Sequence, residues 1–254
     1  LSGLLVRGLA FGDRIGKDVW SSIARYPSLF FIGGCHALGI WIDKIVFWFG
    51  DGVTIAAGVR AHPLYDTSCF LAYLTVLPAL ALNLVVLETR FYERYRAYYD
   101  ALVERHPLRD IEWQRNEMVE TLREGAIMLL RWQGLCTGLA IVFAPVLLDL
   151  FGMPLGMVRP FRLACLGAFF QVLFLIALLV LLYFDLRRQA LRHALVFCVG
   201  NGVLATISLI GDYPFYGAGY ALAGFVSLFL AVQSLQRALP ELEYRTLRRA
   251  AIGR

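Results

Sequence analysis

The chain has 254 residues and a net charge of +5, and 59% of its residues are hydrophobic while only 17% are charged. A soluble domain is nearer half apolar and a quarter charged, so an apolar excess of this size would not fit inside one soluble core. The composition excludes a disordered chain, and five widely spaced cysteines without a CxxC pair exclude a secreted disulfide scaffold. The mean hydropathy of +0.64 instead predicts an α-helical membrane protein with several spans.

Apolar runs of about 20 residues are long enough to cross roughly 30 Å of hydrocarbon. The sequence contains six of them, at about 27–49, 67–87, 127–150, 163–184, 193–211 and 214–232. Because the alternating pattern of strands is absent, we expect an all-α polytopic membrane protein with six membrane-spanning helices over 27–236. Pro78 and Pro145 fall inside predicted spans and should kink them.

Basic residues predict the orientation of these spans. Nineteen Lys and Arg residues lie before the first span, between the second and third, between the fourth and fifth, and in the tail, against Arg60, Arg159 and Arg162 on the other side. The positive-inside rule therefore predicts that both termini are cytoplasmic. The net positive charge is then explained by the orientation of the spans and by attraction to the lipid bilayer, so no nucleic-acid partner is needed to explain it.

Both ends of the chain lie outside the predicted spans. Residues 1–26 are too polar to span, and fit either the end of a preceding span or an amphipathic interfacial helix. Residues 237–254 form a basic tail that we expect in the cytoplasm.

A densely charged segment over 88–123 separates the second and third spans. It holds eight acidic residues and seven arginines, which predicts a cytoplasmic hairpin of two helices with a turn at His106-Pro107 and Asp110 as N-cap of the second. Its tyrosines fit two interpretations: packing against the return helix through Trp113 and Met118, or docking of a cytoplasmic partner. The candidate docking residues are Tyr92, Arg94, Tyr95, Tyr98 and Tyr99.

Ionisable residues inside spans are costly and therefore mark candidate sites. Asp43 and Lys44 are adjacent, so their side chains leave the helix about 100° apart. We expect that they cannot both be hidden by pairing with each other, and that one faces an aqueous path or a partner on another span. The candidate substrate-path residues are His36, Trp41, Asp43, Lys44, Trp48, Tyr73, Asn83, Glu88, Arg131, Gln171 and Asn201.

Several of these residues have a structural alternative. Gln171 and Asn201 fit helix–helix hydrogen bonds, and Arg131 fits a side chain that reaches from its span to the cytoplasmic interface. The aromatic residues fit the bundle core or the interfacial belt, and Glu88 fits the interface. Asp66, at the start of the second span, is expected to be a helix N-cap.

Nothing in the sequence predicts an active site, a cofactor or a metal. GxSxG, HExxH, Walker A and GxGxxG motifs are absent, and the four histidines are scattered. We therefore expect a protein that is not an enzyme, and a membrane enzyme acting on lipid-linked sugar is the weakest alternative.

Three stretches resemble the PelG family, the membrane transporter subunit of Pel exopolysaccharide export. They are the sequences ETRFYERY and YYD at 88–95 and 98–100, DYPFYGAGY at 212–220, and LPELEY at 239–244. Members of that family resemble two-lobed multidrug/oligosaccharidyl-lipid/polysaccharide flippases, and the resemblance covers the C-terminal half or slightly more of the family's length. It therefore implies that the six helices of 27–236 form one lobe of a two-lobed flippase-like transporter. It carries no catalytic residue over to this chain.

The resemblance implies a bacterial inner-membrane protein that moves a hexosamine-rich exopolysaccharide during biofilm matrix synthesis. It also implies partners: the polysaccharide substrate, a cytoplasmic glycosyltransferase, and membrane subunits including a cyclic-di-GMP receptor. In such a path Trp41, Trp48 and Tyr73 could stack on sugar rings, while Asp43 and Glu88 could attract amino sugars. The main alternative is a membrane scaffold that recruits and activates the glycosyltransferase without forming the path.

Overall fold

The computed structural model describes residues 25–104, 106–211 and 215–239, and the fold is almost entirely helical. Six helical segments are long and apolar enough to cross a membrane, which confirms the predicted number of spans. These segments are Pro27–Gly50, Pro63–Val103, Leu108–Val142, Leu155–Tyr183, Arg187–Ile210 and Ala218–Ala238. The predicted segment 1–26 lies outside the described residues except for Arg25 and Tyr26, and the predicted tail lies outside them beyond Leu239.

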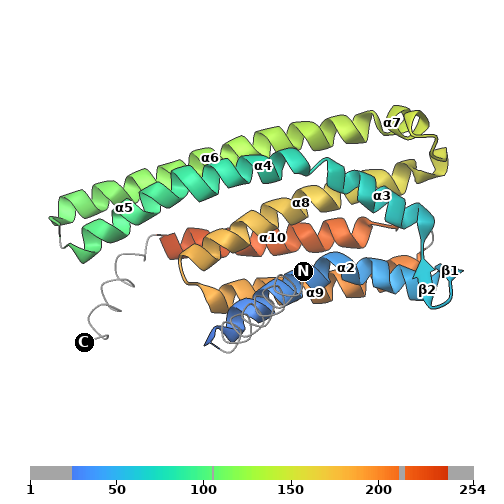
Figure 1. The fold of residues 1–254 in the computed structure, drawn as a ribbon, viewed down its shortest axis with the longest axis horizontal. Helices are drawn as coiled ribbons and strands as arrows, with labels where there is room; N and C mark the ends of the chain where they lie inside the picture. The colour runs from blue at the N-terminus through green and yellow to red at the C-terminus, as the bar shows by residue number, and fades with distance from the viewer. Residues whose placement is uncertain (1–24, 105, 212–214, 240–254) are drawn as a thin grey trace, which may run out of the picture.

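The elements follow the chain in the order labelled in Figure 1. They are α2 (Pro27–Gly50), β1 (Val53–Ala56), β2 (Val59–Ala61), α3 (Pro63–Leu74), α4 (Leu77–Val85), the π-helix η1 (Val86–Phe91), α5 (Tyr92–Val103), α6 (Leu108–Val142), α7 (Ala144–Leu150), the short 3-10 helix η2 (Leu155–Met157), α8 (Val158–Tyr183), α9 (Arg187–Ile210) and α10 (Ala218–Ala238).

The helices form two groups that meet along α8. In the first group, α2 lies along α9, and α10 packs against both α8 and α9. In the second, α4, η1 and α5 lie beside α6, and both α3 and α6 contact α8. The span that contains α8 is the most enclosed, because 61% of its most apolar 18-residue stretch is buried inside the protein. This explains why its sequence is apolar on all sides rather than amphipathic.

Both proline residues expected to disturb spans do so. Helix α3 ends at Leu74 and α4 starts at Leu77, with Pro78 in its first turn; likewise α6 ends at Val142 and α7 starts at Ala144, just before Pro145. A helix break frees backbone carbonyls that lipid cannot satisfy. Here the amide nitrogen of Gln133 on α6 donates to the carbonyl of Thr75, at 3.1 Å.

The charged segment forms the expected helical hairpin. Helix α6 has 35 residues, about 52 Å at 1.5 Å per residue, so part of it extends beyond a bilayer core of about 30 Å. Its antiparallel neighbour there is α5 (Figure 1). The expected N-cap is wrong by three residues: Pro107 precedes the first helical residue, and Asp110 lies in the first turn.

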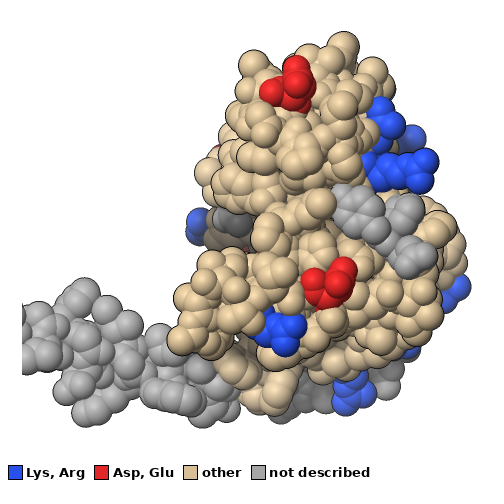
Figure 2. Space-filling model, turned by 90° about the vertical axis from the view of Figure 1, so that its right-hand side faces the viewer, with Lys and Arg blue, Asp and Glu red and all other residues tan. Residues whose placement is uncertain are grey.

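A short β-hairpin between α2 and α3 was not expected from the sequence. Val53 pairs with Ala61 and Thr54 with Arg60, and Gly58 takes a positive φ of 80° at the turn. Its two strands have only four and three residues and are largely exposed, so they leave no periodic apolar pattern. The hairpin lies at one end of the bundle, and the face of that end seen in Figure 2 carries few charged side chains.

Candidate functional site

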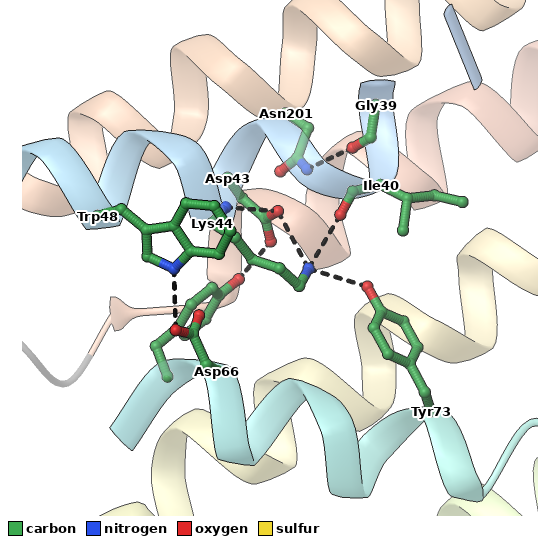
Figure 3. A network of polar contacts seen from close by, with 9 residues as sticks. Gly39, Ile40, Asp43, Lys44, Trp48, Asp66, Tyr73 and Asn201 are labelled. Carbon is green, nitrogen blue, oxygen red and sulfur yellow. Dashed lines mark hydrogen bonds and ion pairs between the residues drawn. The ribbon is translucent and has the colours of Figure 1, made fainter. Parts of the chain in front are cut away.

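The predicted ionisable pair of α2 lies in a buried polar network between α2 and α3 (Figure 3), with the Tyr220 ring of α10 beside it. Asp43 is 1% exposed. One carboxylate oxygen, Oδ1, accepts the backbone N–H of Lys44 at 2.8 Å, and the other, Oδ2, accepts the hydroxyl of Tyr65 at 2.5 Å. Both carboxylate oxygens therefore have donors, which offsets the cost of removing the charge from water.

Lys44 supplies the opposite charge and is 5% exposed. Its Nζ lies 3.3 Å from Asp43 Oδ1, and donates to the carbonyl of Ile40 at 2.9 Å and to the hydroxyl of Tyr73 at 3.0 Å. The rings of Trp41, Tyr73 and Tyr220 lie 5.8, 5.2 and 5.7 Å from the same nitrogen. The ammonium thus has an ion-pair partner, two oxygen acceptors and three aromatic rings around it.

The expectation that Asp43 and Lys44 could not hide each other is wrong. The long Lys44 side chain turns back along α2 to the Ile40 carbonyl, one turn earlier, and this brings its Nζ to the neighbouring carboxylate. The alternative of partners on another span holds as well, since Tyr65 and Tyr73 are on α3. The pair is tolerated because it is matched: Asp43 is 1% and Lys44 5% exposed, and each has partners on α2 and α3.

A second polar link joins α2 to the start of α3. The indole N–H of Trp48 donates to Asp66 Oδ2 at 2.9 Å, and the same oxygen accepts the backbone N–H of His62 at 2.9 Å. The N-cap of α3 is His62, whose Nδ1 accepts the backbone N–H of Tyr65 at 3.2 Å. Asp66 is therefore not the N-cap that the sequence suggested, but a first-turn residue that anchors Trp48.

On its other side, α2 contacts α9 closely. The side-chain amide of Asn201, fully buried on α9, donates to the carbonyl of Gly39 at 2.9 Å, which is the expected helix–helix hydrogen bond. A Cβ at Gly39 would lie 2.5 Å from the Phe197 ring, so only glycine permits this approach. His36, one turn earlier, is buried with its ring 5.8 Å from those of Phe174 and Phe197.

The sequence matches a protein-family model. The model is PelG, described as "Putative exopolysaccharide Exporter (EPS-E)", and it covers residues 1–247 of the chain. The chain belongs to the PelG family. No curated protein matches it, and no solved structure does. Family membership and the six apolar helices together describe a multi-pass membrane protein of an exopolysaccharide exporter family rather than of an enzyme family.

The candidate path residues of this PelG family member do not all converge. Trp41, Asp43, Lys44, Trp48 and Tyr73 belong to the network between α2 and α3. His36 and Asn201 line the α2–α9 contact. Gln171 is buried in α8, beside α10, and Asn83 is half-buried on α4. Arg131 is exposed on α6, beside a hollow of about 370 Å³ that Glu124 and Trp132 also line. The side chain of Glu88 lies outside the described residues. Their shared role as a substrate path stays a prediction.

Two members of the network were missed by the sequence reasoning. Tyr65 donates to Asp43, and Cys69 lies against the Tyr65 hydroxyl. Tyr65, Cys69 and Tyr73 follow one another at four-residue intervals, so they share one face of α3. That spacing, on the span next to one that carries an ionisable pair, is the signal that could have identified them.

The tyrosines of the hairpin pack inward more than a docking surface requires. Tyr98 is fully buried, Tyr99 is half-buried, and the Tyr95 hydroxyl donates to the backbone carbonyl of Tyr183 on α8 at 3.0 Å. Of the five candidates, only Tyr92 and Arg94 are exposed. The exposed fraction is 45% for the residue Tyr92 and 45% for the side chain of Arg94. Of the two expected packing partners, Met118 is buried in the same hydrophobic cluster as Tyr98, whereas Trp113 is exposed.

Proposed function

We propose that this chain is a transporter subunit that moves a hexosamine-rich exopolysaccharide across the bacterial inner membrane during biofilm matrix synthesis. The observation that carries the proposal is the match of residues 1–247 to an exopolysaccharide exporter family. The six membrane-length helices fit this role, since an exporter must provide a route through the bilayer. In this proposal the six spans form one lobe of a flippase-like transporter, and the substrate passes between this lobe and a second one.

The polar network between α2 and α3 supports a transport role. Ionisable residues within membrane spans are rare and commonly belong to substrate or ion pathways. Asp43 and Lys44 are such residues, and Trp41 beside them is 53% exposed. An exposed indole offers a flat apolar face on which a sugar ring can stack. Rocking of the lobes would bring the network into contact with the path.

The arginine distribution supports a cytoplasmic position for both termini and for the hairpin. The hairpin is then available to a cytoplasmic glycosyltransferase, through Tyr92 and Arg94. Membrane subunits, including a cyclic-di-GMP receptor, complete the proposed complex. In cells these partners would couple polymer synthesis to export.

The transport role is tested by Asp43→Asn and Lys44→Met, singly and together, in the cells that carry the complete export system. Each single change leaves one buried partner without its counter-charge, so we expect polymer secretion to fall by about tenfold or more. Secreted polymer is measured together with the amount of assembled complex in purified membranes. Gly34→Ala on the exposed face of α2 is the matched control, since a Cβ there meets nothing within 4 Å.

The outcomes separate a transport role from a structural one. If secretion falls while the complex assembles normally, Asp43 and Lys44 act in export. If the double variant restores secretion, the pair only holds helices together, and its part in the transport mechanism is refuted. Loss of assembly in both single variants leads to the same conclusion.

The scaffold function is favoured by one observation, the projection of the α5–α6 hairpin beyond the bundle (Figure 1). A scaffold would recruit and activate the glycosyltransferase without forming the path. Under that alternative, the Asp43 and Lys44 variants that still assemble keep normal secretion, whereas changes on the exposed face of the hairpin lower it.

A further inference from the structure

The apolar part of α6 carries a single charged residue, and it lies on the exposed side of the helix. Between Glu124 and the end of α6 at Val142, Arg131 is the only Asp, Glu, Lys or Arg. Helix α6 lies at the edge of the bundle (Figure 1), and Arg131 is exposed whereas Leu129 and Gln133 are buried. A charge on the lipid-facing side of a span is costly unless it meets water or a polar headgroup. The guanidinium of Arg131 therefore calls for a polar partner.

A hollow beside Arg131 shows where such a partner fits. Its volume is about 370 Å³, and it is lined by Glu124, Ile127, Met128, Arg131 and Trp132. The first four follow one another at three- and four-residue intervals, so they share one face of α6. Helical side chains lean toward the helix N-terminus, which directs Arg131 over Ile127 and Met128 toward Glu124. The hollow thus has a guanidinium at one end, a carboxylate at the other and an apolar floor between them.

The two charged groups of the hollow do not pair with each other. Seven residues of helix separate Arg131 from Glu124, about 10 Å along the axis. Neither side chain forms an ion pair or a hydrogen bond with another of the residues that the structure describes. Just outside the hollow, by contrast, Arg123 pairs with Glu120 at 3.8 Å. The hollow therefore presents both charges, at a separation that suits a molecule carrying one charge of each sign.

The hollow lies where the apolar part of the span begins. The charged sequence of the α5–α6 hairpin ends at Glu124, and residues 125–142 are apolar apart from a few polar groups and Arg131. Trp132 is 52% exposed, and exposed tryptophans gather at the level of the lipid headgroups. An arginine close to the end of a span extends its side chain to the same level. The guanidinium then lies at the depth of the lipid phosphates, and the Glu124 carboxylate lies nearer to water.

We propose that this hollow binds the headgroup of phosphatidylethanolamine from the leaflet at the α5–α6 hairpin end of the bundle. The phosphate accepts hydrogen bonds from the Arg131 guanidinium, whose planar donors match phosphate oxygens. The ammonium, which has three N–H donors, donates to the Glu124 carboxylate. In the lipid the ammonium is attached on the water side of the phosphate, the same order in which Glu124 and Arg131 lie along α6. The glycerol and upper acyl carbons cover Ile127 and Met128.

The charge pattern separates this headgroup from the other common ones. The quaternary ammonium of phosphatidylcholine has no N–H to donate to Glu124. Phosphatidylglycerol brings a phosphate for Arg131 but no positive charge for Glu124, and its net negative charge is repelled by that carboxylate. This inference assigns Arg131 to the lipid-facing surface rather than to the substrate path. It does not depend on what the protein transports.

Trp132 provides a local measurement, because it lines the hollow. Full-length protein is reconstituted in phosphatidylcholine vesicles that contain increasing fractions of one lipid with brominated acyl chains, which quench nearby tryptophan fluorescence. The lipid is phosphatidylethanolamine, phosphatidylcholine or phosphatidylglycerol, all with the same chains. The signal of Trp132 is the difference between each protein and the same protein carrying Trp132→Phe. The fraction of brominated lipid at half-quenching gives its relative affinity for the hollow.

We expect phosphatidylethanolamine to bind up to about fivefold more tightly than phosphatidylcholine, the factor that one accessible ion pair supplies. Glu124→Gln should abolish this preference and raise the affinity for phosphatidylglycerol. Arg131→Gln should weaken the preference and lower phosphatidylglycerol below phosphatidylcholine. Arg123→Gln and Glu120→Gln remove the same charges just outside the hollow, so both should keep the wild-type order. All four side chains are exposed, so none of these changes should disturb the fold.

Several results would overturn the proposal. Equal quenching by phosphatidylethanolamine and phosphatidylcholine in the wild type would show that the ammonium is not recognised. Stronger quenching by phosphatidylglycerol would make the hollow a site for anionic lipid instead. No quenching of Trp132 by any lipid would show that protein, not lipid, covers this face. A preference that survives Glu124→Gln, or that Arg123→Gln weakens as much as Arg131→Gln does, would trace the effect to surface charge in general. Glu124→Lys is the second variant, and it contradicts the proposal unless it favours phosphatidylglycerol.

Discussion

At the scale of single residues, helix α2 can approach α9 closely because Gly39 has no side chain. Gly39 lies opposite the Phe197 ring and the Cα of Cys198, and a Cβ there would be 2.5 Å from the ring and 3.2 Å from the Cα. The close approach also makes the Gly39 carbonyl available to the buried amide of Asn201. In lipid, where apolar side chains gain little by leaving the solvent, such close packing and hydrogen bonding supply much of the attraction between helices.

Gly39→Ala should therefore destabilise the protein. The Phe197 ring is fully buried and has little room to move, so we expect a loss of about 1–3 kcal/mol in the free energy of unfolding. Gly34→Ala on the same helix is the control, since its Cβ meets nothing within 4 Å and alanine favours the helix by up to about 1 kcal/mol. Unfolding of the purified protein in mixed detergent micelles measures both. Equal stability of the two variants would show that α2 and α9 are not in this close contact.

The sequence identified Asp43 and Lys44 as candidates, because charges are rare in spans, but it could not supply their partners. The argument from the helix period assumes that each side chain points straight out from the helix axis. A lysine is long enough to bend back by one turn, and here it does so to reach the Ile40 carbonyl. Tyr65 escaped notice because a tyrosine near a span end is ordinary in the interfacial belt. Side-chain length and the neighbouring helix, not the period, decided the geometry.

At the scale of elements, hydropathy was sufficient to find all six spans, because each must present about 20 apolar residues to lipid. The breaks near Pro78 and Pro145 also followed from the sequence, since proline removes a helical donor. The hydrogen bond from Gln133 to Thr75 that satisfies the first break joins residues 58 positions apart. No local pattern contains such a pairing. For the same reason, inward packing of Tyr98 was only one of the two interpretations that the sequence allowed for the hairpin.

The hairpin offers a test at this scale, because its tyrosines differ in burial. Replacing the exposed Tyr92 and Arg94 together with alanine should leave the fold intact, as surface changes usually alter stability by less than about 0.5 kcal/mol. If the hairpin docks the glycosyltransferase, co-purification of that enzyme with the membrane complex should fall. Tyr98→Ala is the contrasting variant, and its cavity should cost about 3–5 kcal/mol. Unchanged co-purification of the Tyr92/Arg94 variant would remove this face as the docking site.

At the scale of the whole molecule, the two ends of the bundle differ in charge. The β-hairpin end carries Arg60, Arg159 and Arg162, and Figure 2 shows a face with few charged side chains. At the opposite end, α5 meets the start of α6 and α8 connects to α9, and most of the arginines of the described residues lie there. Arginine is retained on the side from which spans are inserted. The fold therefore keeps the polarity that the sequence indicated, with every long span connecting the two ends.

This polarity predicts which loops are accessible from each side of the membrane. Ala57, at the exposed turn of the β-hairpin, should face outward, and Leu108, exposed at the tip of the helical hairpin, should face the cytoplasm. In a cysteine-free background, Ala57→Cys should react with a membrane-impermeant maleimide in intact spheroplasts, whereas Leu108→Cys should react only after the membrane is permeabilised. Both sites are exposed, so a difference in labelling reports sidedness rather than burial. The reverse pattern would place both termini outside, and the arginine-rich end would then need a different explanation from the positive-inside rule.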